Sequence, residues 1–120
     1  MKKKVTWGEA WVVLRPGTTM DDITAQVIHA DVMKQYGPEN KGLWRQFGQI
    51  CSVTESSNGF PFKPEDMAEA NAQARLAAYV AFLKLPSSVT DKLLIAYNAV
   101  NADGDVTIED VTDEGDQKKA

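Results

Sequence analysis

The sequence has 120 residues, of which 43% are hydrophobic and 25% are charged, and its formal net charge is −4. These values are typical of one soluble domain with an ordinary core, and they leave little room for a second domain. No apolar run approaches the roughly 20 residues that a membrane-spanning helix needs, and the basic N-terminus lacks the apolar stretch of a signal peptide. We therefore expect a cytoplasmic protein with no membrane partner. The single cysteine, Cys51, agrees, because one cysteine forms no internal disulfide.

The charge is distributed unevenly along the chain. Residues 101–120 hold seven acidic residues and two lysines, a balance of −5, whereas residues 1–100 hold ten acidic residues and eleven Lys or Arg, a balance of +1. The sequence contains no basic stripe with interleaved aromatic residues, which is the pattern of a nucleic-acid interface. We expect no nucleic-acid partner and an acidic segment that follows a nearly neutral body.

Two elements are predicted in the first third of the chain. Val and Trp residues flank Gly8-Glu9, which predicts a short β-hairpin that ends at Pro16-Gly17. A helix follows, because Thr18 stands three residues before Asp21 in capping-box spacing, and Gly37-Pro38 is a strong stop. The apolar positions at helical spacing are Ile23, Val27 and Ala30, flanked by Ile28, Val32 and Tyr36.

The middle of the chain has a less regular pattern. Apolar residues at helical spacing predict a helix near residues 43–54, although Gly48 weakens it and the end at "CSV" is compatible with a strand. The segment "ESSNG" is predicted to be a loop. Phe60 and Phe62 then flank Pro61, and they are the best candidates for exposed apolar contact, although packing back on the core is the favoured interpretation.

Two further helices are predicted before residue 101. The first starts at Pro64, which suits a first turn, and ends at Pro86. Its apolar stripe consists of Ala68, Ala72, Leu76, Tyr79, Val80 and Leu83. The second starts at Ser88, three residues before Asp91, which is again capping-box spacing. Its apolar face consists of Val89, Leu93, Ala96, Tyr97 and Val100. The short connection predicts that the two helices are antiparallel neighbours.

Together these elements predict a mainly α (α+β) fold. A short N-terminal β-hairpin is followed by three to four packed helices, which form a single globular domain over residues 1–100. Residues 101–120 are predicted to be a flexible, disordered acidic tail.

The acidic segment contains one pattern with chemical meaning, a partial calcium-binding loop. An EF-hand loop needs oxygen ligands at positions 1, 3 and 5, Gly at position 6 and a bidentate Glu at position 12. A loop that starts at Asn101 has Val106 where Gly is needed and Thr112 in place of the Glu. Val resists the positive φ that such a turn uses.

A second register starts at Ala99 and places Gly104 at position 6 and Asp110 at position 12. This register resembles the shorter-armed loops of dockerin modules, but Ala99 supplies no side-chain ligand. A small EF-hand-like or dockerin-like calcium module over residues 99–112 is therefore the alternative interpretation, and a solvated acidic tail is the favoured one. No cofactor is expected.

The remaining chemistry-bearing residues predict no catalytic or metal site. His29 is the only histidine, and one histidine forms no metal cluster. The only reason to pair Cys51 with His29 as nucleophile and base is that each is the single residue of its type. A buried structural thiol is the default interpretation of Cys51. We therefore expect a protein that is not an enzyme.

The layout of residues 5–100 resembles the tail assembly chaperones of long-tailed bacteriophages. The likeness lies in "WVVLRPGTTMDDI", in "LWRQFGQICSV" leading to "NGFPF", and in "ARLAAYVAFLKLPSSVTDKLLIAYNAVN". The resemblance implies a small, mainly helical, non-enzymatic protein that self-associates. Such a protein coats the tape measure protein and keeps it soluble before the tail tube protein polymerises around it.

An alanine-rich helix pair would offer a groove for a partner helix. The residues expected to contact the partner are Phe60, Phe62, Leu76, Val80, Leu93 and Tyr97. A third possibility left open by the sequence is a protein that inhibits another protein through its acidic tail.

Overall fold

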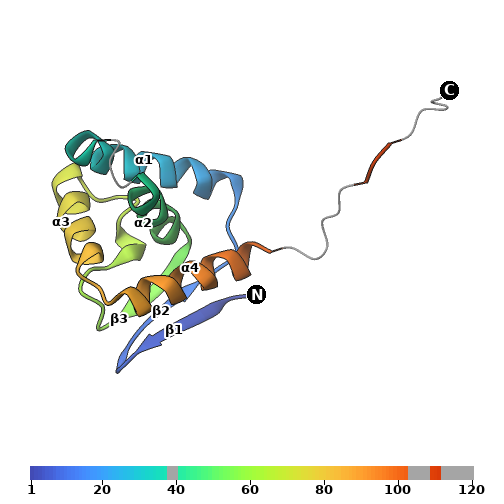
Figure 1. The fold of residues 1–120 in the computed structure, drawn as a ribbon, viewed down its shortest axis with the longest axis horizontal. Coiled ribbons are helices and arrows are strands. Elements are labelled where there is room, and N and C mark those ends of the chain that lie inside the picture. The colour runs from blue at the N-terminus through green and yellow to red at the C-terminus, as the bar shows by residue number, and fades with distance from the viewer. Residues whose placement is uncertain (38–40, 103–108, 112–120) are drawn as a thin grey trace.

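The computed structural model describes residues 1–37, 41–102 and 109–111 and has the α+β architecture that the sequence predicts (Figure 1). A three-stranded sheet lies on one side of the body, α4 crosses it, and α1, α2 and α3 form the other side. The elements are β1 (Lys3–Trp7), β2 (Ala10–Leu14), α1 (Thr19–Tyr36), α2 (Lys41–Val53), β3 (Thr54–Asn58), the 3-10 turn η1 (Pro64–Asp66), α3 (Ala72–Leu83) and α4 (Ser87–Asn101).

The sheet is antiparallel with the strand order β1-β2-β3. The predicted hairpin is confirmed, and Gly8 has a φ of 61°, which suits glycine in a two-residue hairpin turn. The prediction of a loop at "ESSNG" is wrong, because β3 pairs with β2 from Thr54 to Asn58. Pairing with the available edge of β2 outweighs the low strand propensity of Ser and Asn.

Helix α1 has the predicted start and end. Thr18 and Asp21 form a complete capping box, and the N–H of Gly37 donates to the carbonyl of Met33. The predicted apolar stripe is wrong, because α1 buries Ala25, Ile28 and Val32. Ile23 and Val27 are each 51% exposed. The residues that flank the predicted stripe, Ile28, Val32 and Tyr36, face the core instead.

Helix α2 supplies the centre of the core. Phe47 is fully buried, and its ring lies 5.4 Å from that of Tyr79 and 5.5 Å from that of Phe82. Gly48 faces α1, where a Cβ would lie 2.6 Å from the carbonyl oxygen of Ala25. The glycine that weakens the helix in isolation therefore permits the close approach of α1 and α2.

Helix α3 starts later than predicted, because Pro64 opens only the short η1 turn. Asn71 caps α3, and its Oδ1 accepts from the N–H of Ala74 at 2.8 Å. The buried side of α3 consists of Arg75, Ala78, Tyr79 and Phe82. The predicted stripe is therefore wrong except for Tyr79: Ala68 lies before the helix, and the other members are half-buried or exposed.

The burial of Arg75 accounts for the difference between the predicted and the observed buried face of α3. Its guanidinium is buried and donates to the carbonyls of Met67 and Ala68 and to Asp31 of α1 at 2.9 Å. A long cationic side chain at the helix interface is satisfied by carbonyls of the turn before α3.

The apolar face predicted for α4 is confirmed, because Val89, Leu93, Ala96 and Val100 are buried. The capping box at Ser88 is wrong: Pro86 occupies the N-cap, and no side chain caps the helix. The antiparallel pairing of α3 and α4 is also wrong. Helix α3 packs against α1 and α2, whereas α4 packs against β1, β2 and α2.

The predicted tail over 101–120 lies mostly outside the described residues. Glu109, Asp110 and Val111 are exposed and belong to no helix or strand. In the part of the chain that the structure describes, every helix is too short or too polar to cross a bilayer.

Candidate partner-binding surface

The six residues expected to contact a partner do not form one surface. Leu93 is 1% exposed and belongs to the core of the domain, so it is removed from the candidate set. Tyr97, one turn further along α4, is half-buried and packs against the core. Leu76 and Val80 are half-buried on α3. Because α3 and α4 are not neighbours, the groove expected between them does not exist.

Phe60 and Phe62 pack back towards the core while staying half-buried. The ring of Phe62 lies 5.8 Å from that of Phe47, and Phe60 lies 5.3 Å from Phe62. Trp7 of the hairpin meets Phe60 edge-to-face at 6.4 Å. The favoured interpretation of these two residues is confirmed, and they join the hairpin to the core.

Exposed apolar side chains form a row on α1. We call Met20, Ile23 and Val27 the outer row of α1. They are 66%, 51% and 51% exposed, and their i, i+3, i+7 spacing places them on one side of the helix. The opposite side of α1 is already buried, so this helix is apolar on two faces. Single exposed apolar residues are ordinary, but a row of three in register is typical of an interaction surface.

A groove lies beside the outer row, between α1 and α2. It has a volume of about 640 Å³ and is lined by Asp22, Ala25, Gln26, His29, Ala30, Met33, Arg45 and Gln49. Met33 is 42% exposed and extends the apolar surface of α1 towards this groove. A ridge of apolar side chains next to a polar-rimmed groove is the shape that an amphipathic helix fits.

His29 forms part of the groove wall by stacking on Trp44. The two rings are 4.8 Å apart and nearly parallel, with an angle of 12° between their planes. Burial lowers the pKa of His29, and the nearby Arg45 lowers it further. The neutral imidazole is therefore the form that the folded protein favours.

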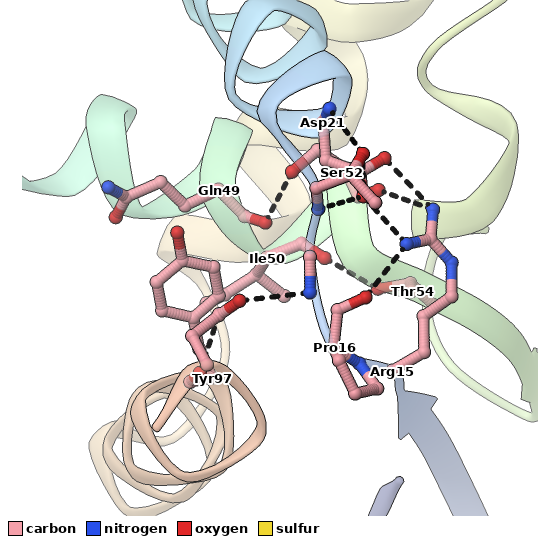
Figure 2. A network of polar contacts seen from close by, with 11 residues as sticks. Arg15, Pro16, Asp21, Gln49, Ile50, Ser52, Thr54 and Tyr97 are labelled. Carbon is pink, nitrogen blue, oxygen red and sulfur yellow. Dashed lines mark hydrogen bonds and ion pairs between the residues drawn. The ribbon is translucent and has the colours of Figure 1, made fainter. Parts of the chain in front are cut away.

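The strongest polar network of the described residues holds the start of α1 in place (Figure 2). Arg15 donates to both carboxylate oxygens of Asp21, at 2.7 and 3.0 Å, and to the carbonyl of Ser52 at 3.2 Å. These contacts lower the pKa of Asp21 to about 2, chiefly through the hydrogen bond from Arg15. This network joins β2, α1 and the end of α2, and it is structural because its donors and acceptors satisfy one another.

Asn101 closes the same junction from α4. Its Oδ1 accepts from the N–H of Gly17 at 2.9 Å, and its Nδ2 donates to the carbonyl of Tyr97 at 2.8 Å. Asn101 would be the first ligand of the EF-hand register, and here its amide ties the end of α4 to the start of α1. Residues 103–108, which would supply most of the calcium ligands, lie outside the described residues.

Cys51 and His29 have separate structural environments. Burial raises the pKa of the Cys51 thiol far above its usual range, so the reactive thiolate is disfavoured. In the described ranges 1–37, 41–102 and 109–111, no three His, Cys, Asp or Glu side chains are grouped so that they could hold a metal ion.

Comparisons with known proteins add no relative to this description. No family model, no curated protein and no solved structure matches the chain.

Proposed function

We propose that this protein is a non-enzymatic tail assembly chaperone of a long-tailed bacteriophage. In the cytoplasm of the host cell, it binds the tape measure protein and keeps it soluble until the tail tube protein assembles around it. The observation that carries this proposal is the uncovered outer row of α1, a helix whose other face is already buried. The choice of this family rests on the resemblance in the layout of residues 5–100.

The outer row and the adjacent groove fit a helical segment of the tape measure protein. A partner helix would bury Ile23 and Val27 against its own apolar face, while Gln26, Arg45 and Gln49 would contact its polar flank. Burying each of the two half-exposed side chains contributes on the order of 1 kcal/mol, which is about fivefold in affinity. A holding protein needs several such modest contacts and no reactive group.

Calorimetric titration of a tape measure fragment from the same genome tests this proposal. The double variant Ile23→Lys/Val27→Lys should weaken binding by about two orders of magnitude, because it places two charges where apolar contact is expected. Both positions are exposed, so the fold should tolerate the change.

Leu83→Lys provides the control. Leu83 is 41% exposed, but it lies on α3 and lines neither the groove beside α1 nor the groove beside β1, so this variant should bind the fragment with unchanged affinity. Equal loss of binding in both variants would show that the added charge, and not the loss of the outer row, weakens binding. Unchanged binding in the double variant would show that the outer row is not the binding surface.

A further inference from the structure

Strand β1 forms a free edge of the sheet. In the order β1-β2-β3, β1 has a partner strand on one side only, and no backbone hydrogen bond joins its other side to the described residues. The alternation of an antiparallel ladder turns every second residue of β1 outward, with an unpaired N–H and C=O. Such an edge is a template for an added strand.

A groove runs along this edge, between β1 and α4. Its volume is about 480 Å³, and its walls are Lys3, Lys4, Val5, Thr6, Lys92, Ile95, Ala96 and Ala99. Ile95 is 62% exposed, which makes it the most exposed large apolar side chain of α4. The groove therefore combines an unpaired strand edge with an apolar wall.

The charge of this groove has one sign. Lys3, Lys4 and Lys92 line it, and no acidic residue does. Lys2, just before β1, forms an ion pair with Glu55 at 2.8 Å, whereas the three groove lysines form no ion pair with the described residues. The groove thus selects an extended, acidic ligand with some apolar side chains.

The chain itself carries a segment of this chemistry. Residues 103–113, "DGDVTIEDVTD", contain five acidic residues and no basic residue. Val106 and Ile108 are two positions apart, so in an added strand they would lie on the same face. Asp-Gly at its start is a turn signal and not part of the strand pattern.

Helix α4 runs along the groove and ends at Asn101, and Ala102 lies beside Met1 and Gly17 at a separate cavity. The described part of the segment does not occupy the groove of its own chain, because Glu109, Asp110 and Val111 are all exposed and Val111 is 90% exposed. This exposure favours a second copy as the donor of the segment.

We propose that the β1–α4 groove of one copy binds residues 103–113 of a second copy as an additional strand. Two copies that exchange their segments reciprocally would close a dimer, and a one-way exchange would generate a ring or a chain of copies. Figure 1 places β1 and α1 on opposite sides of the body, so this self-association leaves the outer row of α1 open. The inference goes beyond the proposed function and is tested separately from it.

A charge-swap experiment tests the proposal with the full chain. The groove variant is Lys3→Glu/Lys4→Glu/Lys92→Glu, and the segment variant is Asp105→Lys/Glu109→Lys/Asp110→Lys. We expect the wild type to form concentration-dependent oligomers in light scattering at low salt, with dissociation in high salt. Each variant alone should be monomeric, and an equimolar mixture of the two should associate again, because an acidic groove then meets a basic segment.

Three results would overturn the proposal: a monomeric wild type at every concentration, variants that associate like the wild type, or a mixture that stays monomeric. A segment that folds back on its own groove would give the first of these. Circular dichroism establishes that each variant is folded.

A peptide experiment avoids any folding defect of the triple variants. The labelled peptide 103–113 should bind the full-length wild type and should bind Ile95→Ser about tenfold more weakly, because this change removes the apolar wall and leaves the charge of the groove unchanged. A scrambled peptide of the same composition controls for charge alone, because it keeps the acidic residues and loses the order of Val106 and Ile108. Equal binding of both peptides would reject strand addition in favour of unspecific attraction.

Discussion

At the scale of single residues, Asp21 links Arg15 to the first turn of α1. It accepts both hydrogen bonds from Arg15 and also accepts from the N–H of Thr18 at 2.8 Å. The Asp21 side chain is 13% exposed and that of Arg15 is 34% exposed, so their charge-assisted bonds are partly shielded from solvent. The junction of β2, α1 and α2 should therefore depend on its charge.

We predict that Asp21→Asn lowers the free energy of unfolding by about 2 kcal/mol at pH 6, because an amide nitrogen would face the donors of Arg15 and Thr18. Chemical denaturation measures the change. Asp22→Asn is the control, since Asp22 is exposed, stands in the same helical turn and forms no ion pair with the described residues. An equal loss in both variants would show that helix-terminal charge, and not the Arg15 pair, is responsible.

The same pair predicts a dependence on acid pH. The pKa of Asp21 is lowered from 3.8 to about 2, so the folded state favours the carboxylate. Its contribution to stability is complete above pH 3.8 and disappears as the pH falls towards about 2. The stability difference between wild type and Asp21→Asn should therefore shrink over this interval in urea unfolding curves. A constant difference from pH 6 to pH 2 would contradict this assignment.

His29 predicts a second dependence, at milder pH. Its pKa is lowered below 6.5 by burial and by Arg45, and Asp22 and Arg45 are the charged side chains that line the same groove. The unfolded chain therefore takes up a proton before the folded chain does, and stability should decrease as the pH falls below 6.5. Between pH 7.5 and 5, the melting temperature of wild type should therefore fall relative to that of His29→Gln. Parallel curves would remove His29 as the cause.

Local chemistry was predictable at this scale, and distant partners were not. The capping box of Thr18 and Asp21 follows from a spacing of three residues. Arg15 and Asp21 meet only because the chain turns at Pro16-Gly17, and Arg75 reaches Asp31 across 44 positions of sequence. Such contacts depend on tertiary packing, which local spacing does not encode.

At the scale of elements, the approach of α1 to α2 depends on Gly48. A Cβ at this position would lie 2.6 Å from the Ala25 carbonyl oxygen and 3.2 Å from the Cβ of His29. We predict that Gly48→Ala destabilises the fold by more than about 1 kcal/mol, even though alanine favours helix formation.

Gly42→Ala is the matched variant in the same helix. A Cβ there would meet no atom within 4 Å, so stability should stay the same or rise. Thermal unfolding of the two variants separates packing from propensity. If Gly48→Ala were as stable as Gly42→Ala, the close contact would carry no energetic weight.

Element types were predictable from sequence, whereas the faces they bury were less so. Periodicity locates α1 correctly, but both of its faces are apolar, so periodicity alone could not identify the buried one. In α3, the burial of Arg75 displaces the stripe expected from alanine and leucine. In α4 the polar side is clear, and its face was predicted correctly.

At the scale of the whole molecule, two candidate surfaces lie on opposite sides of the body. The outer row of α1 is apolar, and the β1–α4 groove is basic and borders a free strand edge. Neither surface was predicted from the sequence. Both faces of α1 are apolar, so periodicity could not show which of them is exposed, and the groove forms only where α4 folds against β1.

The central claim is that the outer row of α1 holds the tape measure protein in solution. The most direct measurement is the soluble fraction of that protein when it is co-expressed with wild type, with Ile23→Lys/Val27→Lys or with Leu83→Lys. We predict that wild type and Leu83→Lys raise the soluble fraction and that the double variant does not. A double variant that is folded and as effective as wild type, or a wild type without effect, would contradict the account.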